Sequence, residues 1–177
     1  MIPRQFLGLG FETAKHIVAM GGTVILACRS IEKAQVARDL IIEQTKCQKG
    51  KIIVMQLDLS VTSSVRQFAV DFQALNLPLH ALINNAGVMM SQRHLTEEGF
   101  ERVFVVNYLG HFLLTNLLLP ELERSNGRVV NVASTMHKLL THYDFDNIMS
   151  DKSFSLFGTY AQSKLAMMLF TTELQRR

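Results

Sequence analysis

The chain has 177 residues, 48% of them hydrophobic and 19% charged, so it can bury a substantial core and is not a disordered tail. Its net charge of +3 and isoelectric point near 9.0 are modest, and Lys and Arg are scattered along the sequence, which argues against nucleic-acid binding. The two cysteines, Cys28 and Cys47, are too few for a disulfide framework and lack metal-ligand spacing, which favours a reducing, intracellular compartment. No apolar signal-peptide core follows Arg4 and Gln5.

The first half of the sequence alternates between helical and strand patterns. Apolar residues recur at helical spacing in two stretches, and β-branched residues gather in two short runs. Gly21 and Gly22 accept positive φ and are expected to end the first helix, while Ser30 can cap the second. The predicted elements are, in chain order, a helix over 10–20, a strand over 23–28, a helix over 31–44 and a strand over 51–60.

The second half repeats this alternation. It predicts a helix over 63–75, a strand over 80–84, a long helix capped by Thr96, a strand over 127–134 and, after a polar stretch over 135–155, a helix over 160–177. Strands that alternate with helices imply a parallel sheet with right-handed crossovers. We therefore expect a single α/β domain over residues 1–177, with a three-layer αβα arrangement around a doubly wound sheet.

One segment requires a membrane test. Residues 103–120 contain no Asp, Glu, Lys or Arg, which places them at the lower length limit of a spanning helix, about 18 to 20 residues. Asn107, His111 and Asn116 would each be costly in lipid. A buried or subunit-contacting helix is therefore favoured over a membrane helix, and we expect no membrane span within this chain.

The sequence YAQSK places Tyr160 and Lys164 four residues apart, on one face of a predicted helix. A cation beside a phenol favours the phenolate, so this pair suits proton transfer. Ser134, at the end of a predicted strand, can donate a hydrogen bond to a substrate oxygen on which charge develops. Together the three residues suit hydride chemistry at an alcohol or carbonyl carbon, although YxxxK alone is common by chance.

Several motifs occur in one order: GLG at a helix start, NNAG after a strand, VNYLGHF, VNVAS and YAQSK. In this combination the sequence resembles the short-chain dehydrogenase/reductase family, and within it the retinol-dehydrogenase-like branch. The resemblance implies a Rossmann-type fold in which Tyr160 acts as general acid or base and Lys164 assists it and holds the nicotinamide ribose. Ser134 would polarise the substrate carbonyl. Asn107 would order a proton relay or, alternatively, satisfy backbone groups in its own helix, and the two roles are compatible.

The resemblance also implies a dinucleotide cofactor. An acidic residue after the second strand usually accepts the ribose 2′-hydroxyl of NAD, whereas an Arg accommodates the 2′-phosphate of NADP. Arg29 stands there, so NADP(H) is favoured over NAD(H), the alternative being an Arg on a solvated helix start. Asp58 could lie beside the adenine or be a helix N-terminal acid. The predicted cofactor contacts are Gly8, Leu9, Gly10, Arg29, Asp58, Leu59, Asn85, Ala86 and Gly87, with Tyr160 and Lys164.

The family's glycine turn is incomplete in this sequence. Aligning its last two glycines with Gly8 and Gly10 places Arg4 at its first glycine and Pro3 at its threonine. The first strand and the strands that follow the YxxxK helix are also missing, which predicts unpaired strand edges and aggregation or failure to fold. We therefore expect a fragment of a longer dehydrogenase. No metal is expected, because no carboxylate or thiol is spaced to join His137 and His142.

Two functions remain open at this point. The first is an NADP-dependent oxidoreductase that acts on a small lipophilic alcohol, aldehyde or ketone, with retinoid or polyprenoid substrates implied by the branch. The second is a noncatalytic partner that pairs with a full-length subunit through the helix from Val103 to Leu119, which could also form a homodimer. The expected location is intracellular, either cytoplasmic or at the endoplasmic reticulum if a longer parent carries an upstream anchor.

Overall fold

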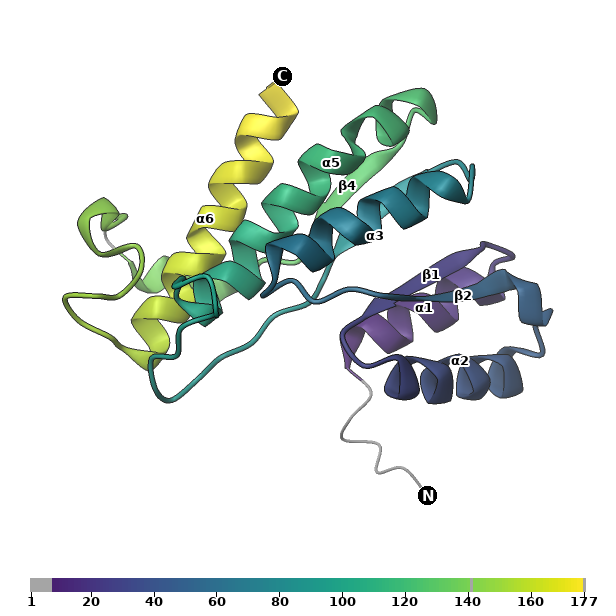
Figure 1. Cartoon of the computed structure of the whole chain (residues 1–177), viewed down its shortest axis with the longest axis horizontal. Coiled ribbons are helices and arrows are strands. Elements are labelled where there is room, and N and C mark those ends of the chain that lie inside the picture. The colour runs from purple at the N-terminus through teal and green to yellow at the C-terminus, as the bar shows by residue number, and fades with distance from the viewer. Residues whose placement is uncertain (1–7, 141, 177) are drawn as a thin grey trace. The chain divides into compact units, whose positions relative to one another are not determined.

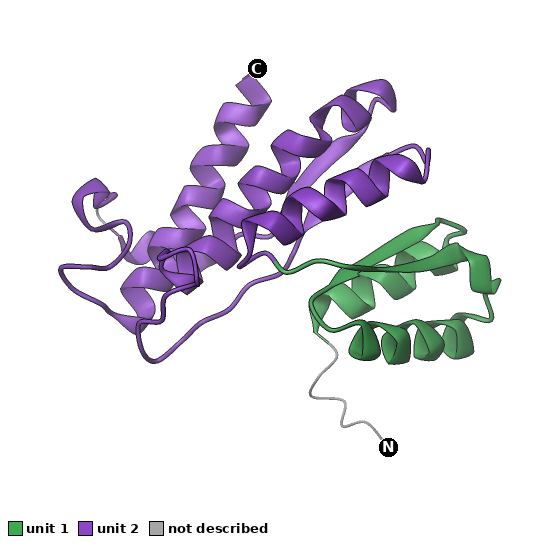
Figure 2. Cartoon of the chain, viewed as in Figure 1, with its two compact units in different colours: residues 1–58 green, residues 59–177 purple. Residues whose placement is uncertain are grey.

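The computed structural model describes residues 8–140 and 142–176. The chain divides between Asp58 and Leu59 into two compact units, drawn in green and purple in Figure 2. The glycine-turn positions Pro3 and Arg4 lie outside the described residues. The single domain expected from the sequence stays a prediction.

The first unit is a parallel two-stranded sheet with two helices. It comprises α1 (Leu9–Ala19), β1 (Val24–Cys28), α2 (Ile31–Thr45) and β2 (Ile52–Gln56), in that order (Figure 1). Val24 pairs with Ile52, and both helices contact the strands and each other. The core is formed by apolar side chains from the helices and β2: Phe11, Ala14, Val18, Ile41 and Ile52.

The helix-end signals read from the sequence in this unit are confirmed. Gly21 has φ +90°, a conformation that L side chains rarely adopt, and it follows α1 directly after Met20. Ser30 Oγ accepts a hydrogen bond from the backbone N–H of Lys33 at 3.3 Å, as an N-cap does. Local sequence therefore fixes where α1 ends and where α2 begins.

The second unit contains three long helices and a second parallel strand pair. It begins with α3 (Thr62–Ala74) and β3 (Ala81–Asn84), continues through a helix from Arg102 to Arg124, and ends with β4 (Arg128–Asn131) and α6 (Leu156–Arg176). Ala81 pairs with Arg128. In Figure 1, α5 lies between α3 and α6, and β4 lies behind α5. Their packed faces are apolar, with Val65, Leu118 and Met167 almost fully buried.

The helix from Arg102 to Arg124 is continuous but not uniform. It consists of α4 (Arg102–Phe104), a π-helix (Val105–Leu109) and α5 (Gly110–Arg124). By length and hydropathy it could cross a membrane, and half of its most apolar window is buried inside the structure. The helix packs against α3 and α6. This arrangement is the one expected of a core helix, which the polar residues within the segment favoured over a membrane helix.

The strands confirm the predicted alternation with helices and agree with the unpaired strand edges expected from the missing first strand. All four are parallel to their partners and alternate with helices, as expected for an α/β fold. Within the described residues they form two separate pairs, β1 with β2 and β3 with β4, and not one continuous sheet. In the doubly wound order the first strand lies between the second and the fourth. That strand would have to precede α1, where the described residues begin.

The prediction that Thr96 caps the long helix is wrong. The helix begins at Arg102, and the buried carboxylate of Glu101 accepts hydrogen bonds from the N–H groups of residues 103 and 104. Thr96 instead closes a turn, in which its Oγ1 accepts from the backbone N–H of Phe100 at 3.2 Å. A carboxylate at a helix N-terminus satisfies two donors and interacts favourably with the helix dipole, so Glu101 is the stronger cap.

Gly110 lets α5 pack directly on the backbone of Leu59. A Cβ atom at this position would lie 2.5 Å from the carbonyl oxygen of Leu59 and 2.9 Å from its Cβ. We expect Gly110→Ala to lower the free energy of unfolding by about 3 kcal/mol, because backbone must move to relieve the overlap. Urea unfolding measures this, with Gly50→Ala as control because nothing lies within 4 Å of its added carbon. Equal losses in both variants would contradict the packing argument.

Candidate active site

Tyr160 and Lys164 lie one turn apart on α6. The helix begins at Leu156, four residues before its predicted start, so both side chains project from regular helix. Lys164 Nζ lies 5.7 Å from the centroid of the Tyr160 ring, and Tyr160 is partly exposed. A small molecule can therefore reach the phenol, and a cation lies beside its ring as the YxxxK spacing predicts.

Lys164 is held in place by the end of β4. The residue is only 4% exposed, and its Nζ donates a 2.9 Å hydrogen bond to the carbonyl oxygen of Val132. Burial lowers the pKa of Lys164 below its ordinary value, because surroundings of low polarity disfavour the ammonium. The neutral carbonyl positions the ammonium without cancelling its charge.

Asn107 lies fully buried in the π-helix. Its Oδ1 accepts a 2.7 Å hydrogen bond from the N–H of Val88, and its Nδ2 donates to the Val88 carbonyl at 2.9 Å and to Ser163 Oγ at 3.0 Å. The backbone groups that Asn107 bonds belong to Val88, and not to its own helix as the structural alternative supposed. The same bonds join the segment after β3 to α6 beside Lys164, so the amide also helps to build the site. Its part in a proton relay stays a prediction.

The segment from Asn85 to Gly87 runs close to these buried side chains. A Cβ atom placed on Gly87 would lie 3.4 Å from both Asn107 Oδ1 and Lys164 Nζ. The absence of a side chain therefore lets this backbone approach the ammonium closely. Ala86 and Gly87 are exposed, so a ligand can reach them from the other side.

Ser134 stands between β4 and a 3₁₀-helix (Thr135–Leu139). Its Oγ accepts a 3.3 Å hydrogen bond from the N–H of Met136, which leaves the hydroxyl hydrogen for another acceptor. Ser134 lies two residues beyond Val132, whose carbonyl holds Lys164. The end of β4 thus supplies both the anchor of the ammonium and the predicted carbonyl-polarising hydroxyl.

His111 is a site residue that sequence reasoning missed. It was noted only as a polar group unsuited to lipid, yet it is 3% exposed and its Nε2 lies 2.9 Å from the carbonyl oxygen of Ala86. Burial, with a smaller contribution from the Lys164 charge, lowers its pKa to about 4 against the opposing effect of that hydrogen bond. The sequence feature that could have identified His111 as a site residue is its position four residues after Asn107.

The predicted cofactor contacts of the first unit lie at the start of α1 and after its two strands. Gly8 caps α1 with φ −81°, which any residue can adopt, and an added Cβ would meet nothing within 4 Å. If glycine is required at this position, the reason would be the close approach of a ligand to the backbone and not backbone strain. Leu9 is 72% exposed, Gly10 follows in the first turn, and Arg29 is exposed directly after β1. Asp58 is partly buried two residues after β2.

Leu59, the remaining predicted cofactor contact, opens the second unit. Leu59 is 7% exposed, and its backbone lies against Gly110. Little of the residue is therefore open to a ligand. Its role as a cofactor contact stays a prediction.

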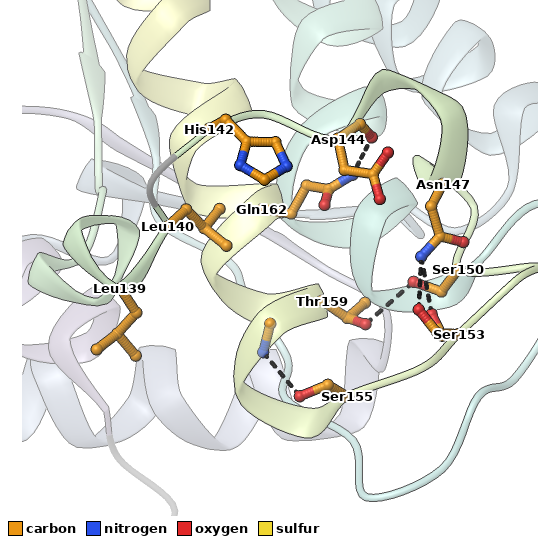
Figure 3. A pocket seen from close by; sticks show the side chains of 11 residues that line it. Leu139, Leu140, His142, Asp144, Asn147, Ser150, Ser153, Ser155, Thr159 and Gln162 are labelled. Carbon is orange, nitrogen blue, oxygen red and sulfur yellow. Dashed lines mark hydrogen bonds between the residues drawn. The ribbon is translucent and has the colours of Figure 1, made fainter.

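A cavity of 260 Å³ lies beside α6 (Figure 3). It is lined by eleven residues between Leu139 and Gln162, and none of the four predicted catalytic residues is among them. Its polar groups bond within the protein: Ser150 Oγ lies 3.0 Å from Thr159 Oγ1, and Gln162 Nε2 donates to the carbonyl oxygen of Asp144 at 3.0 Å.

Metal-ligand geometry is not found in the part of the chain that the structure describes. There, no group of three or more His, Cys, Asp and Glu side chains could hold a metal ion. His137 lies in the 3₁₀-helix after β4, with its Nδ1 2.5 Å from the carbonyl oxygen of Ser134. His137 therefore contacts a backbone carbonyl.

Residues 5–177 match the family model described as short chain dehydrogenase, so the chain belongs to the short-chain dehydrogenase family. The resemblance read from the motifs is thereby confirmed at the level of the family. Parallel strands that alternate with helices and the YxxxK pair on α6 agree with this assignment.

The relatives that the chain resembles include polyprenol and retinol dehydrogenases. The chain is 44% identical to human polyprenol dehydrogenase over 174 residues and 47% identical to human retinol dehydrogenase 11 over 172 residues. Each match covers 96% of this chain and 52% or 53% of the relative, so the chain spans about half the length of the curated relatives it matches. An uncharacterised protein from Mycobacterium paratuberculosis, 39% identical, has a TM-score of 0.80 over 96% of this chain and 58% of its own.

Proposed function

We propose that the chain carries the catalytic part of an NADP-dependent oxidoreductase that acts on a lipophilic alcohol, aldehyde or ketone. The observation that supports this most directly is the partly exposed Tyr160 beside the buried Lys164, with Nζ 5.7 Å from the ring centroid. The names of the retinol and polyprenol dehydrogenases that the chain resembles support a retinoid-like or polyprenoid-like substrate.

The second unit fits the nicotinamide part of such a cofactor. Exposed backbone at Ala86 and Gly87 lies over a buried ammonium, and Nζ of Lys164 has N–H donors left after its bond to Val132. Lys164 would hold ribose hydroxyls with these donors, and the Asn85–Gly87 segment would pack against the nucleotide. Bound NADP(H) would supply or accept the hydride.

The side chains of the site would move and stabilise the accompanying proton. In reduction, Tyr160 gives its hydroxyl proton to the substrate oxygen as the hydride reaches the carbonyl carbon; in oxidation, the phenolate takes the proton back. The Lys164 ammonium stabilises the negative charge left on the phenol oxygen. Ser134 Oγ donates a hydrogen bond to the same substrate oxygen.

Titration of the 177-residue chain with NADPH tests this function. We expect the midpoint of thermal unfolding to rise with NADPH concentration, and we expect NADPH-dependent reduction of retinaldehyde. An unfolding curve that is indifferent to NADPH, together with no turnover, would contradict catalysis by this chain and assign the activity to a longer protein.

Arg29→Asp tests the cofactor preference. Arg29 is exposed directly after β1, and in our proposal its guanidinium pairs with the 2′-phosphate, so we expect the Kd for NADPH to rise at least about 10-fold while binding of NADH holds or improves. Isothermal titration calorimetry with both nucleotides measures the change. Lys49→Asp is the matched control, since Lys49 precedes β2 at the amino end of the same sheet. Equal increases in the Kd for NADPH in the two variants would mean that the change in net charge causes the effect, and not the loss of a contact between Arg29 and the 2′-phosphate.

A second function, that of a noncatalytic partner, is favoured by exposed apolar side chains on α5 and α6. Phe112 is 38% exposed and Leu169 is 50% exposed, although neighbouring positions of both helices are buried. Such side chains suit a subunit contact. Sedimentation analysis of the wild type and of Phe112→Ser measures self-association. If the chain self-associates through this surface, the substitution should weaken the association; a monomeric wild type would contradict self-association.

A further inference from the structure

The segment Ala86–Val88 is tied to the long helix at two adjoining points. Asn107 bonds the N–H and the carbonyl of Val88, at 2.7 and 2.9 Å. Further along the same helix, Nε2 of His111 lies 2.9 Å from the carbonyl oxygen of Ala86. Two buried side chains of one helix therefore hold neighbouring residues of one segment.

The contact with Ala86 defines the state of the His111 ring. A carbonyl oxygen only accepts, so the proton must be on Nε2, and Nδ1 carries a lone pair. Nδ1 is buried and has no hydrogen-bond partner among residues 8–140 and 142–176. Lys164 is the charged group that acts on the ring, and burial with this charge keeps it neutral at pH 7. The hydrogen bond to Ala86 is therefore what orients the ring.

We propose that His111 is a positioning residue that fixes the Ala86 carbonyl and thereby the orientation of the Ala86–Gly87 peptide over Lys164. Both residues of this peptide are exposed, so without the bond the carbonyl could turn to water at little cost. The bond removes that freedom before a ligand arrives, which is how preorganisation improves binding. The consequence for cofactor binding rests on the function proposed above, whereas the hydrogen bond itself does not.

Two substitutions separate the hydrogen bond from the volume of the ring. His111→Phe keeps a planar ring of similar size and removes the donor, whereas His111→Gln restores an N–H donor at similar reach. Amide hydrogen exchange of Val88, whose N–H is bonded to Asn107, reports how firmly the segment is held. We expect exchange of the Val88 amide to be about 10-fold faster in His111→Phe and within about 3-fold of wild type in His111→Gln. Asn116→Ala is the control, because Asn116 is exposed on the same helix and its Nδ2 donates to the carbonyl oxygen of Phe112 at 2.7 Å, within that helix.

The pattern of exchange distinguishes positioning from general support of the fold. A positioning role predicts faster exchange confined to residues 86–88, with α5 and α6 unchanged. Uniformly faster exchange throughout both helices in His111→Phe, or no rescue by Gln, would overturn the proposal. A proton on Nδ1 in nitrogen-15 spectra of the His111 ring at pH 7 would overturn it as well.

Cofactor titration provides the functional readout. We expect His111→Phe to raise the Kd for NADPH about 5-fold to 10-fold, with kcat changed less than about 3-fold because Tyr160 and Lys164 are untouched, and His111→Gln to restore the affinity. If wild type does not bind NADPH, the proposed function fails for this chain, and the exchange and ring spectra still decide the role of His111. If wild type binds NADPH and His111→Phe binds it equally well, the positioning role is wrong.

Discussion

Replacing Tyr160 with Phe is expected to lower kcat for NADPH-dependent reduction of retinaldehyde by about 10³-fold. The substitution removes only the hydroxyl and keeps the ring whose centroid lies 5.7 Å from Lys164 Nζ. The substrate oxygen then lacks its proton donor, while the residues expected to bind substrate and cofactor remain. KM and the Kd for NADPH should therefore stay within about 3-fold of wild type, and steady-state kinetics with calorimetric titration measure both.

Tyr143→Phe is the matched control for this variant. Tyr143 belongs to the same unit, and its ring lies 4.8 Å from that of Phe145, between centroids. Burial, followed by the electrostatic effect of Tyr108, raises the pKa of Tyr143 to about 12, so its hydroxyl gives up its proton less readily than that of an ordinary tyrosine. Retention of more than a tenth of wild-type kcat in Tyr160→Phe, or an equal loss in Tyr143→Phe, would contradict the assigned role.

Replacing Lys164 with Met is expected to separate activity from stability. We expect kcat to fall about 10²-fold and the Kd for NADPH to rise about 10-fold, because the ammonium would stabilise the phenolate and bind ribose hydroxyls. The free energy of unfolding should change by less than about 1 kcal/mol. Met fills a similar volume, and relief from burying a charge offsets the lost hydrogen bond to Val132.

The pH dependence of stability gives Lys164→Met a second readout. The pKa of Lys164 is lowered in the folded chain, so between that value and the ordinary value of 10.5 the unfolded chain binds more protons. The free energy of unfolding of the wild type therefore contains a contribution that rises with pH across this window. In Lys164→Met this pH-dependent contribution should be absent. Lys152→Met, at an exposed position, is the control. A loss of several kcal/mol at pH 7 in Lys164→Met would instead make Lys164 a structural residue.

Local sequence signals predicted the elements of this fold well, because they act over a few residues. Ser30 caps α2 through a bond to Lys33, and Gly21 follows α1 with positive φ. Thr96 shows where such reasoning fails. A hydroxyl side chain before an apolar segment has the same sequence pattern whether it caps the following helix or closes a separate turn. The separation into two strand pairs agrees with the expected unpaired strand edges, an expectation that came from the strand order of the resembled family and not from a local pattern.

The candidate site was predictable where chemistry leaves a motif. The spacing of Tyr160 and Lys164 placed both on one face of α6, and the structure puts the cation beside the ring. His111 was not predictable in this way, since an isolated histidine in an apolar helix resembles a packed core residue. Its role depends on the approach of the Ala86 carbonyl, from a segment 25 residues away.

The π-helix Val105–Leu109 constrains how this part of the chain can vary in length. The N–H of Gly110 bonds the carbonyl of Val105 five residues earlier, so the turn holds one residue more than an α-helical turn. Deleting one residue there is expected to convert the turn to a regular α-helical turn while the segments before and after it keep nearly the same orientation, because the π-helical turn holds the extra residue within about the same rotation. A deletion within α5 has no such extra residue to remove, so it would rotate the chain on one side of it by about 100° relative to the other. Single-residue deletions are therefore expected to be better tolerated within Val105–Leu109 than within α5.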